Sequence, residues 1–407
     1  MRYVVTLLGI TLLTLVLVSF ANWLIDPFGR YWSPTITGFN EVKPASVNRV
    51  RVTKAYRAIE VAPEVVLVGN SRVEMGLDPR FSFFSASRVY NIAMPGASVG
   101  MQVDYALNTI YATGTVKRLI VGVDFLDFLE RASFFDQPPA ESKEPSYRRR
   151  LLHITAADFE KRWYSWREQA SLIFSLDSFY AGVLTLASRN SNPSVIDEYG
   201  FNTAQDYVGV IRKEGVNALF VQKITELGGN LSSAPRLIAS HDGKRYSPSF
   251  DHLRRLLDET DKLGIEVTLF ISPYHFSYLY LLADVGLIDE FWRWKVLLTQ
   301  QLSERAVHAP VLWDFSIFSD PVLEPVPMDR PKTAMTWYWE PAHYRRELGD
   351  RMLEVMLGDV ESELAIRLDQ TTVEGVILQG KKDLKLSRAR WLALIAGLGL
   401  APVSPPH

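Results

Sequence analysis

Short apolar runs alternate with longer amphipathic stretches along the middle of the chain. The apolar runs are Val65–Val68, Val89–Ala93, Leu119–Val123, Val267–Ile271 and Val311–Phe315. Helix-like segments lie between them, at Ser98–Thr113, Phe250–Leu263 and Ile288–Arg305. Strands separated by segments long enough for crossover helices are typical of a parallel sheet. The pattern therefore predicts an α/β domain with a parallel central sheet.

A long segment, about residues 130–246, interrupts this alternation after the third strand. It has several short helical stretches and is rich in aromatic residues: Phe134, Phe135, Trp163, Tyr164, Trp166, Phe174, Phe179 and Tyr180. Because it follows the carboxyl end of a strand, where α/β folds place their ligand sites, we expect a helical cap over that edge. A peripheral helical subdomain is the alternative.

The amino-terminal segment is apolar enough to meet a membrane. Val4–Ile25 is about 22 residues without a charge, which as a helix reaches roughly 33 Å. A cleaved signal peptide is the alternative, with Ser19-Phe20-Ala21 as its cleavage site, but the run is longer than the usual signal core. We expect residues 1–26 to be a single-pass anchor in the inner membrane, with the main domain outside the cytoplasm.

The remaining boundaries follow from composition. Residues 27–62 carry scattered Pro, Gly and Arg without a sustained period, which predicts a stalk or linker, or a segment that wraps the domain. The folded domain is expected over 63–357. Residues 358–407 contain a basic run, an apolar stretch and a Pro-rich end, and we expect a tail that is poorly ordered or docked on the surface.

Charge and residue types exclude several kinds of chemistry. The 407 residues have a formal net charge of -2, which gives no basic field for nucleic acid. The chain has no cysteine and seven scattered histidines, so disulfides and thiolate metal sites are excluded and no metal site is predicted. No Gly-rich phosphate loop follows a strand, and we expect no cofactor.

Two distant segments together hold the residues of a nucleophilic site. Ser71 comes directly after the first predicted strand, at the edge where such sheets bind ligands. His343 stands three residues after Glu340 and ahead of a helix-like segment. A serine, a histidine that takes its proton and a carboxylate that orients the histidine form the general pattern of serine catalysis. A helix-capping serine and a surface Glu–His pair are the alternatives.

Four short blocks give this pattern a family likeness: Val68–Arg72, Tyr90–Ser98, Leu119–Phe125 and Trp337–Tyr344. With these blocks the chain resembles the SGNH (GDSL-like) hydrolase superfamily, and within it the alginate O-acetyltransferase-like branch of membrane-anchored polysaccharide acyltransferases. The resemblance implies a flavodoxin-like, three-layer core with Ser71 as the nucleophile. It also implies that Asn91 and Gly96, in the second block, lie at the oxyanion or substrate site.

The sequence departs from that family at two positions. Asp124 stands where the family has asparagine, and an ionised aspartate cannot donate a hydrogen bond to an oxyanion. Asp124 is either protonated, turned away to orient a group such as Arg72, or the mark of an altered site, and we favour the pairing with Arg72. Glu340 replaces the family's aspartate, and its longer side chain can still accept the imidazole N–H.

One further histidine is a candidate for substrate contact. His275 follows the fourth predicted strand and would reach the same edge of a parallel sheet. A polar loop residue is the alternative interpretation.

These features lead to one functional expectation and two rivals. We expect an O-acetyltransferase that acts on an extracytoplasmic polysaccharide through an acyl-serine, with the acyl group supplied by a multispanning membrane acyltransferase as family members resembling this chain are thought to do. A carbohydrate or lipid esterase would use the same residues. A non-catalytic assembly protein for polysaccharide export on the same fold is the other rival.

Overall fold

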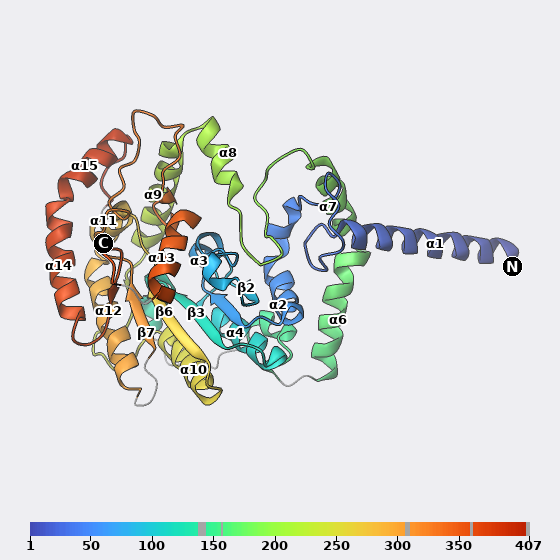
Figure 1. The fold of residues 1–407 in the computed structure, drawn as a ribbon, viewed down its shortest axis with the longest axis horizontal. Helices are drawn as coiled ribbons and strands as arrows, with labels where there is room; N and C mark the ends of the chain where they lie inside the picture. The colour runs from blue at the N-terminus through green and yellow to red at the C-terminus, as the bar shows by residue number, and fades with distance from the viewer. Residues whose placement is uncertain (137–143, 156–157, 306–309, 359–360, 404–407) are drawn as a thin grey trace.

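A six-stranded sheet forms the centre of the protein (Figure 1). The computed structural model describes residues 1–136, 144–155, 158–305, 310–358 and 361–403. The sheet order is β10-β7-β6-β3-β1-β2; β10 is antiparallel to β7, and the other neighbours are parallel. Its strands are β1 (Val65–Val68), β2 (Val89–Asn91), β3 (Arg118–Val123), β6 (Glu266–Ile271), β7 (Val311–Asp314) and β10 (Ile366–Arg367). The predicted α/β fold with a mostly parallel sheet is confirmed.

The central strands are apolar over most of their length because both faces of the sheet are covered. All four residues of β1 are buried, and Val66 pairs with Leu119 of β3. In β3, a Cβ atom at Gly122 would lie 2.5 Å from the side chain of Val73. The missing side chain lets the helix that carries Val73 approach the sheet closely.

Helices cover the sheet on two sides, as Figure 1 shows. One layer contains α4 (Val99–Thr113), α10 (Pro248–Lys262) and α12 (Ile288–Ser303), with α4 packed on α10 and on β1. The other contains α3 (Ser71–Gly76) and α13 (Arg346–Gly358), which pack on each other. The shorter elements are η2 (Ser82–Phe84), η3 (Phe125–Phe128), β8 (Tyr338–Glu340) and β9 (His343–Tyr344).

The long interruption does not form one cap. Its first half, with α6 (Phe159–Phe174) and α7 (Leu176–Ala187), packs on the amino-terminal helix. Only its second half, with α8 (Gln205–Lys213) and α9 (Val216–Ser232), reaches β8. The rest consists of β4 (Glu130–Arg131), α5 (Ala132–Asp136), η4 (Ser146–Arg150) and β5 (Arg236–Leu237). The expected cap over the carboxyl edge is therefore corrected to α8 and α9; residues 137–143 and 156–157 lie outside the described residues.

The segment predicted to be a stalk is folded against the domain. It contains η1 (Pro44–Arg49) and α2 (Val50–Val61), and α2 packs on α4 with Ala55 and Ala58 in the core. Of the alternatives, the wrapping segment is the one observed, and a free stalk or linker is wrong, because Ala55 and Ala58 are buried against the domain. The preceding helix, α1 (Arg2–Ile25), is 24 residues long and apolar enough to cross a membrane.

The carboxyl-terminal tail is helical. Its helices α14 (Val373–Leu386) and α15 (Arg388–Gly397) pack on α12 and on α11 (Phe276–Asp284), respectively. Trp391 is fully buried, stacks on Tyr280 and donates its indole N–H to Asp284 at 2.8 Å. Poor order is therefore the wrong alternative for 373–397, whereas 404–407 lie outside the described residues.

Candidate active site

The turn after β1 places Ser71 at the start of α3. The side-chain oxygen of Asn70 accepts the backbone N–H of Arg72 at 3.0 Å, which caps the helix. At Gly69 a Cβ atom would lie 2.3 Å from the side chain of Val73, so a larger residue would push α3 off the sheet. Ser71 is left half-buried at the carboxyl edge of the sheet.

His343 reaches this serine from the other end of the chain. It begins β9, which pairs with β8 in a two-stranded hairpin ahead of α13. The Oγ atom of Ser71 lies 2.8 Å from Nε2 of His343. The other ring nitrogen, Nδ1, is hydrogen-bonded to Oε1 of Glu340. In the tautomer that satisfies both contacts, Nδ1–H donates to Glu340 and Nε2 accepts the hydroxyl proton of Ser71.

Glu340 is held as an anion. Its side chain is 1% exposed, and its second oxygen accepts the backbone N–H of Ala342 at 2.8 Å. Burial alone would raise the pKa of this carboxyl, but His343 outweighs it, and Lys223 and the Ala342 N–H add to the effect, so the pKa is lowered. An ionised carboxylate in this position fixes the imidazole ring and stabilises its protonated form.

Arg72 connects the two segments that carry the serine and the histidine. Its Nε–H donates to the carbonyl of Ala342 at 2.7 Å, and Nη1 forms an ion pair with Asp124. The guanidinium also lies over the rings of Tyr274 and Tyr278, 4.9 and 5.3 Å from their centroids. Arg72 is buried, so these contacts hold α3 and the His343 hairpin at a fixed separation.

Both carboxylate oxygens of Asp124 already accept hydrogen bonds within the protein. One accepts Arg72, and the other accepts the backbone N–H of Leu126 at 3.0 Å. The pairing with Arg72 is the second of the three roles considered from the sequence, and it leaves Asp124 without a donor for an oxyanion.

A second carboxyl beneath the site was not predicted. Asp127 accepts hydrogen bonds from the side chains of Asn70 at 3.1 Å and Gln102 at 3.0 Å. Burial, followed by the charge of Asp124, raises the pKa of Asp127 to about 7. Its position three residues after Asp124, in the turn after β3, was the available signal.

Asn91 does not lie where the sequence predicted it. Asn91 is fully buried, and its amide donates to the carbonyls of Val73 and Leu77 at 2.9 and 3.1 Å. The prediction of Asn91 at the oxyanion or substrate site was wrong, because its donors are used to hold α3.

Gly96 lies in the loop after β2, at a φ of 61°, a conformation that favours glycine. The β1–β2 pairing continues into this loop, since the Met94 N–H donates to the carbonyl of Gly69 at 3.2 Å. Gly96 therefore follows by two residues Met94, which is hydrogen-bonded to the turn that carries Ser71.

The prediction of His275 as a substrate contact was also wrong. Its side chain is fully buried, with Nδ1 2.7 Å from the hydroxyl of Ser277 and Nε2 2.8 Å from the carbonyl of Glu324. Burial lowers the pKa of His275 to about 4. It caps α11 and fills the space between Phe220 and Tyr338.

An aromatic ring of the inserted segment lies beside His343. Tyr207 of α8 stacks on Trp339, with 5.5 Å between centroids, and lies 6.4 Å from the ring of His343. Burial, and then the charge of Glu340, raises the pKa of Tyr207. Tyr207 is not among the aromatic residues that the sequence singled out in this segment, because buried and exposed aromatics cannot be told apart by residue type.

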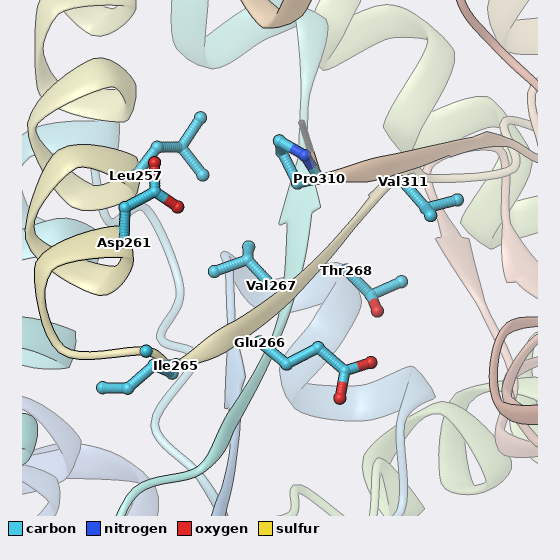
Figure 2. Close-up of a pocket in the computed structure, with 9 residues that line it drawn as sticks. Leu257, Asp261, Ile265, Glu266, Val267, Thr268, Pro310 and Val311 are labelled. Carbon is cyan, nitrogen blue, oxygen red and sulfur yellow. The ribbon is translucent and has the colours of Figure 1, made fainter. Parts of the chain in front are cut away.

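The cavity at the other edge of the sheet is separate from this site. The cavity in Figure 2, about 380 Å³, lies at the opposite edge of the sheet, where Glu266 and Val311 begin their strands. Among the residues that the structure describes, no group of three or more His, Asp or Glu side chains is arranged to hold a metal ion.

Comparison with known proteins adds no family to this geometry. No protein-family model matches the chain, and no curated protein matches it in sequence.

Proposed function

We propose that this protein is a serine-dependent O-acyltransferase that acetylates an extracytoplasmic polysaccharide. The observation that carries the proposal is the contact of 2.8 Å between Ser71 Oγ and His343 Nε2, with Glu340 on the other ring nitrogen. The likeness of the four sequence blocks to the SGNH superfamily, alginate O-acetyltransferase-like branch, supports it from a separate direction.

The first half of the reaction forms an acyl-enzyme. The Ser71 hydroxyl proton moves to Nε2 of His343 as Oγ attacks the carbonyl carbon of the donor ester. The tetrahedral intermediate collapses, its bond to the donor oxygen breaks, and His343 returns the proton to that leaving group. The anionic Glu340 stabilises the imidazolium that exists between these two steps.

The oxyanion of this intermediate needs hydrogen-bond donors at the serine. Asp124 cannot serve, since its oxygens are occupied as acceptors. The backbone N–H groups of Ser71 and Gly96 are the proposed donors, because the Gly69–Met94 bond joins their two loops.

The second half transfers the acyl group. A sugar hydroxyl gives its proton to His343 and attacks the acyl-serine, and Ser71 leaves with the proton from the histidine. The proposed donor is a multispanning membrane acyltransferase, since α1 would keep the domain beside such a partner in the membrane. The proposed location is the inner membrane, with the domain on the periplasmic side.

A test in cells compares three strains for acyl groups on the polymer: one with Ser71→Ala, one that lacks the whole protein, and one with Ser303→Ala. Ser303 is exposed at the end of α12 and is the matched control. We expect Ser71→Ala and the deletion to lose acylation equally, and Ser303→Ala to retain it. Unchanged acylation with Ser71→Ala, when the deletion abolishes it, would instead support the non-catalytic assembly role.

An esterase is the second candidate because the catalytic histidine is not sealed from water. The side chain of His343 keeps 13% exposure, so water could replace the sugar hydroxyl in the second half-reaction. The purified protein would then release acetate steadily from simple esters without a partner, whereas the transferase is expected to stop after one acyl group per chain until an acceptor is added.

A further inference from the structure

The amino-terminal helix is attached rigidly to the domain. The side chains of Asn40 and Ser33 donate to the carbonyl of Leu24 at 2.7 and 2.9 Å, and the Lys43 ammonium donates to the carbonyl of Ile25 at 2.9 Å. These donors satisfy the last carbonyls of α1, which a helix end otherwise leaves without partners. The direction of α1 therefore fixes the orientation of the whole domain.

The helices α6 and α7 meet at the base of α1. The side chain of Asn22 donates to the carbonyl of Ile173 at 2.6 Å, at the end of α6. Gly182 of α7 packs against Ile25, and a Cβ atom there would lie 3.5 Å from that side chain, in ordinary van der Waals contact. Figure 1 shows α6 running crosswise to α1, and the axes of α6 and α7 differ by 45°.

The outward faces of these two helices are apolar. On α6 the exposed aromatics recur at helical spacing, which places them on one stripe: Phe159, Trp163, Trp166 and Phe174. On α7 the exposed apolar residues are Leu176, Phe179, Tyr180, Val183 and Leu184. Phe159 and Leu176 are 83% and 86% exposed, so the domain leaves these faces uncovered.

The opposite face of α6 is polar and packs on the domain. The Ser165 hydroxyl lies 2.9 Å from that of Tyr56, and Glu168 forms a salt bridge with Arg150 at 2.6 Å. A pair that crossed the bilayer as one broken span would bury these groups in hydrocarbon. With one polar face and one apolar face, α6 has the character of a helix that lies in a membrane interface.

The length of α1 decides how deep this surface lies. From Val4 to Leu17 every residue is exposed, and from Val18 onward the domain begins to cover the helix. That free stretch is about 14 residues or roughly 21 Å, whereas the hydrocarbon core of a bilayer is about 30 Å and needs about 20 residues. The span must therefore continue to about Trp23, which brings the α6–α7 junction to the level of the bilayer.

We propose that the outward faces of α6 and α7 form a membrane-docking surface that lies in the headgroup and upper acyl region of the bilayer that α1 crosses. Its occupant is lipid, because the surface is continuous with the spanning helix and carries Trp, Phe and Tyr flanked by Arg162 and Arg167. This inference does not depend on acyl transfer.

The absence of cysteine in the natural chain allows a direct test. Single cysteines are introduced in the full-length protein at Leu176 and Val183, labelled with an environment-sensitive fluorophore, and reconstituted into phosphatidylcholine–phosphatidylglycerol vesicles. Leu378 on α14 is the matched control because it is also an exposed apolar residue, at 73%. We expect the Leu176 and Val183 labels, but not the Leu378 label, to shift their emission to shorter wavelength and to lose most of their fluorescence to nitroxide-bearing lipids.

The contradicting result is equally specific. If labels at Leu176 and Val183 stay as exposed to water as the label at Leu378, while α1 is inserted, the surface does not bind lipid and the proposal fails. These substitutions replace exposed side chains, so the fold is preserved, and thermal unfolding of each variant verifies it.

Discussion

At Asp124 an acidic residue occupies a position where the family likeness suggested a hydrogen-bond donor, and the structure pairs it with Arg72. The sequence supported this pairing because Arg72 follows the proposed nucleophile directly. The second bond of Arg72, to the carbonyl of Ala342, could not be predicted, because it joins segments 270 residues apart.

The buried ion pair of Arg72 and Asp124 predicts that removing one partner destabilises the protein more than removing both. Arg72→Met leaves Asp124 buried without its partner, and we expect a loss of about 3–5 kcal/mol in the free energy of unfolding. The double variant Arg72→Met/Asp124→Leu removes both charges and is expected to regain a large part of it. Urea denaturation of the single and the double variant measures both free energies of unfolding. Equal values would contradict the inference that Asp124 depends on Arg72 as its partner.

His275 predicts a dependence of stability on pH. The pKa of this side chain is lowered from 6.5 to about 4 in the folded protein, so between these values the unfolded chain binds a proton that the folded protein does not. Stability from this residue is therefore lost as pH falls from 6.5, by about 3 kcal/mol once pH is below 4. The free energy of unfolding of the wild type and of His275→Gln is measured by denaturation across this pH range. The difference between the two proteins should become smaller as pH falls. A difference that does not change with pH would exclude this contribution of His275.

At the scale of elements, the five strands could be predicted because a parallel sheet needs continuous apolar runs, and the predicted runs match the observed strands to within two residues. The short α3 could not, since six residues carry no helical period. Its position depends on close approaches at glycines, which only the folded structure reveals. The inserted segment was predicted only in part: α8 and α9 reach the site, and α6 and α7 fit the peripheral alternative. The sequence did not separate the two parts, because exposed aromatics on α6 have the same spacing as core aromatics.

Two helical glycines form a matched pair that tests the support of α3. A Cβ atom at Gly349 of α13 would lie 1.7 Å from the carbonyl oxygen of Gly76, whereas one at Gly375 of α14 would have nothing within 4 Å. We expect Gly349→Ala to destabilise the protein by about 1–3 kcal/mol and to slow acylation of Ser71. Gly375→Ala is expected to stabilise it by about 0.5–1 kcal/mol. Denaturation midpoints measure both, and equal shifts would show that α3 does not need the close packing.

At the scale of the whole molecule, the segment after α1 and the helices α14 and α15 belong to the folded domain, although the composition of these regions allowed a stalk and a poorly ordered tail. Their order depends on long-range contacts, such as Lys43 on the end of α1 and Trp391 on α11. The average composition of a segment does not reveal a single residue that is buried and anchors the segment to the domain.

The tail can be tested through its buried tryptophan. Trp391→Ala removes a fully buried side chain and its hydrogen bond to Asp284, and we expect a cost of about 3–5 kcal/mol. Leu386→Ala, at a position 71% exposed in the same segment, is the control and should change stability by less than about 0.5 kcal/mol. Thermal unfolding compares them; a neutral Trp391→Ala would mean that the tail does not contribute to the fold.

The proposed function depends on Ser71 accepting an acyl group. The most direct measurement is mass spectrometry of the purified full-length protein after brief reaction with an activated acetyl ester and an acid quench. We predict one acetyl group on the peptide that contains Ser71, its loss in Ser71→Ala and in His343→Gln, and its retention in Ser303→Ala. Acetylation that is absent from Ser71, or unchanged in His343→Gln, would contradict the proposed catalytic site.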